Sequence, residues 1–195
     1  MIMPRKIIIV RHGETDFNVE KILQGHLDTF LNANGLDQAN RVAEKLIKDE
    51  VDIILSSDSK RTYFTALTIA KKLNKKVETT FLLRERYFGK LEGMTFDEIR
   101  KVMWCFGYEN AELNQLIEGR SKKFGVENNK EMQIRLKKLL NQIKKYKNKT
   151  VVLVTHGGTI RELLKLFDLS LARRINNTEC FYLEKNNAGK YALIS

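Results

Sequence analysis

Short runs of apolar, β-branched residues alternate along this chain with longer segments of helical periodicity. Four consecutive β-branched residues, Ile7 to Val10, predict a strand that is covered on both faces, and residues 150–155 have the same character. We expect further strands at residues 51–55 and 77–83, and a closing pair at 180–183 and 191–194 around an Asn-Asn-Ala-Gly turn.

Apolar residues between these runs recur at the spacing of one helix face, so each segment should pack against a sheet. Thr95 and Glu98 form a capping box that begins one of these helices. Strands that alternate with helices predict a three-layer α/β/α fold with a mostly parallel central sheet. The residues expected to face inward are Leu36, Ala39, Ala43, Leu46 and Ile47; Tyr63, Ala66, Leu67 and Ala70; Phe96, Ile99, Val102, Met103 and Phe106; Met132, Leu136, Leu139, Leu140 and Ile143; and Ile160, Leu163, Leu164 and Phe167.

Reactive side chains follow two of the predicted strands directly. Arg11, His12 and Gly13 come after the first strand, and His156 with Gly157 comes after the strand at 150–155. Open α/β sheets bind ligands at the carboxyl ends of their strands, so both junctions are candidate sites. A neutral imidazole can act as a nucleophile, and a neighbouring arginine suits a phosphate while favouring the neutral ring. The residue types alone do not decide which histidine attacks.

A third polar segment, residues 56–61, opens a predicted helix and ends in Arg61. The first turn of a helix offers free amides and positive potential to an anion, and an arginine there adds charge and direction. Taken alone, without the other motif residues, Arg61 would be interpreted as a surface arginine.

Four blocks together resemble the histidine phosphatase superfamily, the branch that includes cofactor-dependent phosphoglycerate mutases and small phosphatases. They are Arg-His-Gly-Glu-Thr at 11–15, Ser-Ser-x-x-x-Arg at 56–61, Glu-Arg-Tyr-x-Gly at 85–89 and Thr-His-Gly at 155–157. The resemblance covers nearly the whole chain. It implies a phosphoglycerate mutase-like fold in a single domain, 1–195, with residues 95–130 as a cap-like insertion.

The resemblance also implies roles. His12 would attack phosphorus and become a phosphohistidine, and Glu85 would protonate the departing oxygen, which otherwise leaves as an alkoxide. His156 would assist as the third catalytic group, and no metal or cofactor is implied. Phosphate-binding positions would be Arg11, Arg61, Asn18 and Gly157, and substrate-binding positions Gln24, Gly25, Arg86 and Tyr87.

Several residues have competing interpretations. Glu92 is the rival carboxylate, which we interpret as a structural partner for neighbouring backbone or arginine. His26 receives no role from the resemblance, and Arg161 should brace the sheet rather than touch phosphate. Asp58 stands where the family often has proline, which weakens the local positive field slightly.

The segment 108–130 departs most from the family pattern. Relatives carry a Gly-Glu-Ser element here, whereas this chain offers Gly119-Arg120-Ser121 or residues 125–128, and neither matches. The departure leaves the substrate open rather than the chemistry. The apolar cluster before it is more typical of core or lid packing than of a ligand site; it consists of Met103, Trp104, Cys105, Phe106 and Tyr108.

Composition adds limits. The chain has 195 residues, 43% of them hydrophobic, which suffices for one sizeable α/β domain. No apolar run is long enough for a membrane span, the first residues lack a signal-peptide core, and Cys105 and Cys180 lack metal-type spacing. We therefore expect buried, reduced thiols in a cytoplasmic protein that is a monomer or homodimer.

The net charge of +11 has two interpretations. It could attract nucleic acid or another polyanion, or it could reflect a lysine-rich solvated surface. The basic residues lack the interleaved aromatics of a single-strand binding surface, so we expect the second.

We therefore expect a phosphomonoesterase acting on a small phosphorylated metabolite. The first alternative is a cofactor-dependent phosphoglycerate mutase or bisphosphatase, which shares the chemistry. The alternative of another class is a catalytically silent protein that binds anions or RNA.

Overall fold

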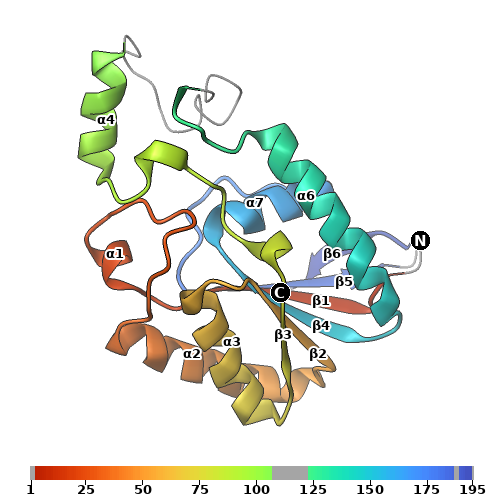
Figure 1. Ribbon diagram of the computed structural model, residues 1–195. Coiled ribbons are helices and arrows are strands. Elements are labelled where there is room, and N and C mark those ends of the chain that lie inside the picture. Colours follow the sequence, from red (N-terminus) through yellow and green to blue (C-terminus); the bar gives the residue numbers. More distant parts are fainter. Residues whose placement is uncertain (1–2, 107–122, 187–188, 195) are drawn as a thin grey trace.

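A six-stranded, mostly parallel sheet forms the centre of the molecule (Figure 1). The computed structural model describes residues 3–106, 123–186 and 189–194. The strand order is β3-β2-β4-β1-β5-β6, and only the last two strands run antiparallel to their neighbours. The strands are β1 (Lys6–Arg11), β2 (Ile53–Ser56), β3 (Val77–Thr79), β4 (Thr150–Thr155), β5 (Cys180–Lys185) and β6 (Tyr191–Ile194).

Helices cover both faces of the sheet, which confirms the predicted three layers (Figure 1). Ile8 and Val10 of β1 face α2 (Ala33–Lys45) and α3 (Lys60–Leu73), whereas Ile7 and Ile9 face α6 (Asn129–Gln142) and α7 (Gly157–Leu166). The four residues are fully buried, as expected for a strand with no solvent face. This alternation explains why β1 is apolar at every position.

The register of the sheet brings the two histidine junctions together. β1 and β4 are parallel neighbours, with Arg11 opposite Thr155, so His12 and His156 leave the sheet at the same edge. β2 lies on the other side of β4, with Ser56 opposite Val154, and it delivers the start of α3 to that edge. Three segments far apart in sequence therefore meet at the carboxyl ends of the strands.

A second, smaller apolar cluster lies beside the main body, around α4 (Phe96–Cys105). Ile99 and Met103 of α4 pack in it with apolar residues from the loops on either side of the helix, which are Leu23, Phe88, Leu91, Phe124 and Val126. Residues 107–122, including Tyr108 and the middle of the predicted cap, lie outside the described residues.

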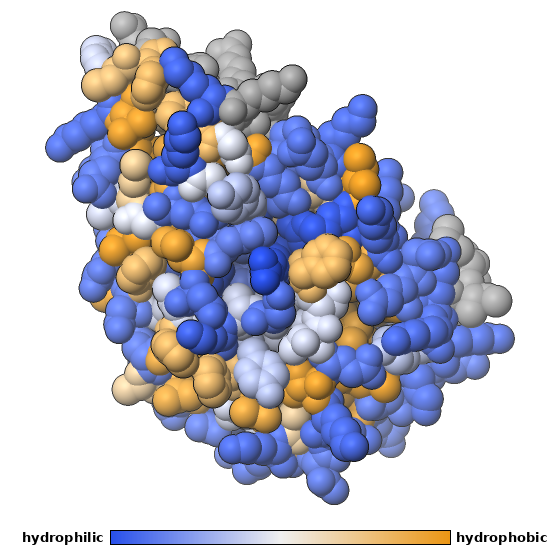
Figure 2. Space-filling view, in the orientation of Figure 1, coloured by the Kyte–Doolittle hydropathy of each residue, from blue (hydrophilic) through white to orange (hydrophobic). Residues whose placement is uncertain are grey.

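Several positions expected to face inward are exposed. Phe96 and Phe106, predicted on the inward face of their helix, are 44% and 47% exposed, and Trp104 of the predicted apolar cluster is 64% exposed. The prediction of core packing is wrong for these three residues. Figure 2 shows the resulting hydrophobic surface over α4. Among the described residues, the small cluster buries one stripe of α4, at Ile99 and Met103. Cys105 is exposed as well, contrary to prediction.

The other boundaries differ in smaller ways. The segment at 77–83 holds only a three-residue strand, followed by a 3₁₀ turn at Phe81–Leu83. The segment after β1 contains a short helix, α1 (Asp16–Val19), capped by Thr15. The capping box of Thr95 and Glu98 is confirmed. Three expected core positions at helix ends are exposed, namely Leu36, Ile47 and Tyr63.

Candidate active site

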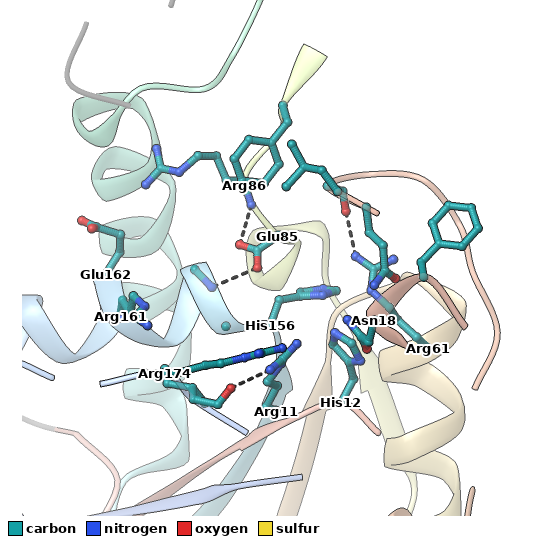
Figure 3. Close-up of a pocket in the computed structure, with 18 of the residues that line it drawn as sticks. Arg11, His12, Asn18, Arg61, Glu85, Arg86, His156, Arg161, Glu162 and Arg174 are labelled. Carbon is teal, nitrogen blue, oxygen red and sulfur yellow. Dashed lines mark hydrogen bonds between the residues drawn. The ribbon is translucent and has the colours of Figure 1, made fainter. Parts of the chain in front are cut away.

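A cavity of about 790 Å³ opens at the strand edge where the two histidines meet. Figure 3 shows the side chains of β1, α3 and α7 converging on it. Ten of the eleven predicted site residues line this cavity: Arg11, His12, Asn18, Gln24, Gly25, Arg61, Glu85, Arg86, His156 and Gly157.

His12 is buried, and one hydrogen bond sets its tautomer. Its Nδ1 lies 2.7 Å from the Gly13 carbonyl oxygen, which only accepts, so Nδ1–H donates and the lone pair remains on Nε2. Burial and the nearby Arg61 and Arg11 hold the pKa of His12 well below its usual value. The ring is therefore neutral at physiological pH, as a nitrogen nucleophile must be.

His156 faces His12, with ring centroids 5.3 Å apart. Burial, followed by Arg61 and His12, lowers the pKa of His156 well below its usual value too. The two rings therefore have similar surroundings, and both are neutral without a ligand. A bound phosphate dianion would shift His156 back toward the protonated donor.

Arg11 and Arg61 are anchored by backbone carbonyls. Arg61 donates from Nη1 to Leu27 O and from Nη2 to Gly25 O, both at 2.7 Å, and Arg11 donates from Nη1 to Ile175 O at 2.6 Å. Burial lowers the pKa of Arg61 to about 10, which leaves the guanidinium charged. Both cations are thus fixed in position before any ligand arrives.

Three buried nitrogens around the cavity have no hydrogen-bond partner within the described part of the chain: Arg11 Nε, Arg61 Nε and His156 Nδ1. Buried donors are normally paired, because an unpaired one costs about 1–3 kcal/mol. Their residues line one cavity. A phosphoryl group supplies oxygen acceptors to the two arginine N–H groups, and to His156 Nδ1 when that nitrogen carries a proton. The arrangement is therefore suited to an anion.

Glu85 is held against the start of α7. Its carboxylate accepts from the Gly158 N–H at 2.9 Å and from the Arg86 N–H at 2.8 Å. A Cβ added at Gly158 would lie 2.5 Å from Glu85 Oε1, so this close approach needs glycine. The backbone thereby fixes a carboxylate at the edge of the cavity.

The remaining predicted positions differ in what they touch. Asn18 Oδ1 accepts from Asn177, and Gln24 accepts from the Thr29 hydroxyl. Arg86 is buried and donates to Glu127 O and Asn129 Oδ1. The structure does not bring Tyr87 to this cavity; its ring lies 5.1 Å from that of His26 and lines a separate groove.

The competing residues also have clear contacts. Glu92 Oε1 accepts from the backbone N–H groups of His26 and Phe88, as expected for a structural partner. Asp58 pairs with Arg84 through two hydrogen bonds of 2.7 Å. Arg161 braces the loop at Leu171 and Arg173 rather than the sheet, and it lines the cavity.

Sequence reasoning missed several charged residues of the cavity. Arg174 lies beside Arg11 (Figure 3); burial is the main cause that lowers the pKa of Arg11, and the charge of Arg174 lowers it further. Lys21 and Lys165 also line the cavity, as does the buried Glu162, which accepts from Lys165 at 2.7 Å. Loop and helix-surface cations of this kind do not differ in sequence from the many other basic residues.

The described residues include neither a membrane-spanning helix nor a metal-binding cluster. No helix among them is long and apolar enough to cross a membrane. No group of three or more His, Cys, Asp or Glu side chains among them could hold a metal ion.

Comparison with known proteins gives the family. The model of the histidine phosphatase superfamily (branch 1) matches residues 7–190. Phosphoglycerate mutase-like protein 4 of Arabidopsis thaliana is 39% identical over 165 residues, covering 81% of this chain and 69% of that protein. The metal-independent phosphoserine phosphatase of the same plant is 36% identical over 178 residues, covering 88% and 73%.

A solved structure agrees. Phosphoserine phosphatase from Entamoeba histolytica, crystallised with 3-phosphoglyceric acid, superimposes with a TM-score of 0.78 at 30% identity, covering 99% of this chain and 96% of that one. The fold and the class of enzyme expected from the sequence are confirmed. The chain is a phosphatase that belongs to the histidine phosphatase superfamily, branch 1.

Proposed function

We propose that this chain is a phosphomonoesterase that hydrolyses a small phosphorylated metabolite through a phosphohistidine on His12. The observation that carries the proposal is the convergence of a neutral imidazole, whose Nε2 lone pair is free, with unpaired nitrogens of Arg11, Arg61 and His156. A nucleophile inside a cradle of cationic and neutral donors is what phosphoryl transfer needs.

In the first step, the Nε2 lone pair of His12 attacks phosphorus and forms a P–N bond while the P–O ester bond breaks. Glu85 gives its proton to the departing oxygen, so the leaving group is an alcohol. Arg11 and Arg61 stabilise the charge spread over the equatorial oxygens. In the second step, water attacks phosphorus, Glu85 accepts the water's proton, and neutral His12 is released with inorganic phosphate.

The cations beyond the cradle support a substrate with a second anionic group. Lys21, Arg161 and Arg174 line the same cavity at positions that the phosphoryl chemistry does not require. Relatives named above act on phosphoserine, or bind 3-phosphoglyceric acid, and both carry a carboxylate. We therefore propose phosphorylated carboxylic acids as the substrate class.

A matched pair of substrates tests this proposal. 3-Phosphoglycerate and glycerol 1-phosphate differ by a carboxylate in place of a hydroxymethyl group. We expect kcat/KM to be at least about tenfold higher for the acid, with phosphoserine also a substrate. Equal kcat/KM values for 3-phosphoglycerate and glycerol 1-phosphate would contradict the proposed substrate class. If none of the three compounds released phosphate, the proposed phosphatase activity would be contradicted. An acid-labile, base-stable phosphoprotein trapped during turnover would support the intermediate.

A mutase or bisphosphatase remains the second candidate, because Glu85-Arg86-Tyr87 resembles the mutase version of the block. A mutase must keep water from its phosphohistidine while the intermediate reorients. Incubation of the chain with 3-phosphoglycerate and 2,3-bisphosphoglycerate distinguishes the two activities. A mutase forms 2-phosphoglycerate, whereas a phosphatase accumulates only phosphate and glycerate.

A further inference from the structure

His26 lies outside the family motifs, yet its ring reaches the backbone of the proposed general acid. Its Nε2 is 2.9 Å from the carbonyl oxygen of Glu85. A carbonyl oxygen only accepts, so His26 carries a proton on Nε2 and donates it. His26, which received no role from the sequence, therefore donates a hydrogen bond to the main chain of Glu85.

The contact is built rather than incidental, because His26 is held on two sides. Its backbone N–H donates to Glu92 Oε1 at 2.8 Å, and its ring packs against Tyr87 with centroids 5.1 Å apart. The preceding Gly25 has a φ of +51°, and a Cβ there would lie 2.0 Å from Glu92 Oε1. The loop can thus adopt this path only with glycine at position 25.

The residues on either side of His26 hold the phosphate cradle. The carbonyls of Gly25 and Leu27 are the two acceptors of the Arg61 guanidinium, each at 2.7 Å. One three-residue segment thereby fixes a cation of the cradle through its backbone and the acid through the His26 side chain. The distance between proton donor and phosphoryl group depends on this segment.

Other contacts to the Glu85 carbonyl are weaker. Arg135 Nη2 lies 3.5 Å from the same oxygen, and the stronger bonds of that guanidinium go to Leu82 O, Arg84 O and Glu127. The Glu85 carboxylate has its own backbone donors. His26 therefore makes the shortest side-chain contact to the main chain of Glu85. His26, Glu85 and His156 also share the wall of a small cavity of about 110 Å³.

We propose that His26 is a positioning residue for the general acid, which couples the place of Glu85 to that of Arg61. The inference rests on the proposed function, because it takes Glu85 as the acid. Loss of the Nε2–H would let Glu85 shift from the leaving oxygen, and small displacements of a proton donor slow the step that needs it. The effect should then depend on how much the leaving group needs a proton.

The test compares benzyl phosphate, whose alkoxide leaves poorly, with p-nitrophenyl phosphate, whose phenolate leaves well. We expect His26→Leu to lower kcat/KM for benzyl phosphate about tenfold and for p-nitrophenyl phosphate by less than about twofold. His26→Gln is the matched control, because its amide nitrogen can donate from a place close to Nε2, and it should recover most of the loss. Thermal unfolding of both variants separates activity from folding.

A double-mutant cycle completes the experiment. In a Glu85→Gln background, His26→Leu should change kcat/KM for benzyl phosphate by less than about twofold, because the acid it positions is gone. Equal losses on the two esters, additive losses in the cycle, or no recovery in His26→Gln would each overturn the inference. If Glu85→Gln itself fails to discriminate between the esters, the proposed acid is wrong; if it discriminates and His26→Leu does not, only the role of His26 is wrong.

Discussion

The imidazole rings of His12 and His156 lie edge to face, with centroids 5.3 Å apart and planes inclined at 62°. The register of two parallel strands creates this contact, because Arg11 pairs with Thr155 and each histidine is the next residue. Each ring is therefore held at the carboxyl end of a buried strand rather than on a free loop. Their shared burial beside Arg61 keeps both neutral.

Removal of the nucleophile should abolish turnover. His12→Ala deletes the only group with a free lone pair that we place in line with phosphorus, so we expect kcat for p-nitrophenyl phosphate to fall by at least about 10³-fold. Steady-state hydrolysis measures this. Circular dichroism should show an intact fold, and retained turnover would refute the assignment of His12.

The general acid should matter according to the leaving group. Glu85→Gln keeps the size and one acceptor oxygen but removes the transferable proton. We expect kcat/KM to fall about 10²–10⁴-fold for benzyl phosphate and about tenfold or less for p-nitrophenyl phosphate. Equal losses for the two esters would count against the acid role.

Gly158 should be required for the placement of the acid. A Cβ there would lie 2.5 Å from Glu85 Oε1, whereas a Cβ at the adjacent Gly157 would lie 3.7 Å from Arg11 Nε, an ordinary contact. We expect Gly158→Ala to reproduce the selective loss on benzyl phosphate and Gly157→Ala to lose less. Kinetics on both esters measure the difference, and a larger loss in Gly157→Ala would show that the carboxylate can move without cost.

Arg174 should contribute to substrate choice. Its side chain lines the cavity beside Arg11, whereas the neighbouring Arg173 lies outside the lining and pairs with Glu179. We expect Arg174→Gln to lower kcat/KM for 3-phosphoglycerate about tenfold, worth ~1.4 kcal/mol, with little change for glycerol 1-phosphate. Arg173→Gln removes the same charge from the next position. A similar loss in both variants would mean that only general electrostatic attraction is involved.

Stability should depend on pH through the two buried histidines. Their pKa values in the folded chain lie well below 6.5, so the unfolded chain binds protons that the folded chain does not. The contribution of the two histidines to the free energy of unfolding is therefore complete above pH 6.5. It decreases as the pH falls below 6.5, by up to about 1.4 kcal/mol per pH unit for each histidine.

Urea denaturation at pH 7.5 and 5.5 measures this slope, in a window above the usual carboxyl range. The His12→Asn/His156→Asn variant lacks both groups and should show a flatter dependence. An unchanged slope would mean that the folded histidines titrate near their usual pH. The same lowered pKa places the acid limb of kcat/KM that belongs to His12 below pH 6.5.

Local pattern was sufficient for the strands and most helices, and the four motif blocks were sufficient for the family resemblance. A continuous apolar run such as Ile7 to Val10 is buried on both faces only when layers cover the strand from both sides. The capping box of Thr95 and Glu98 forms within four consecutive residues. His12 and His156 could also be recognised as candidate site residues, because each directly follows a predicted strand. These features depend on neighbours in the chain, which the sequence contains.

Only the tertiary structure decided which other residues join the site. Periodicity predicts an apolar face but not the area that will cover it, so Phe96 and Phe106 were assigned inward although both are exposed. Arg174 carries no pattern that separates it from the surface cations. The bond from His26 to Glu85 joins two loops whose approach depends on the folded path of each, and no spacing within either loop encodes that approach.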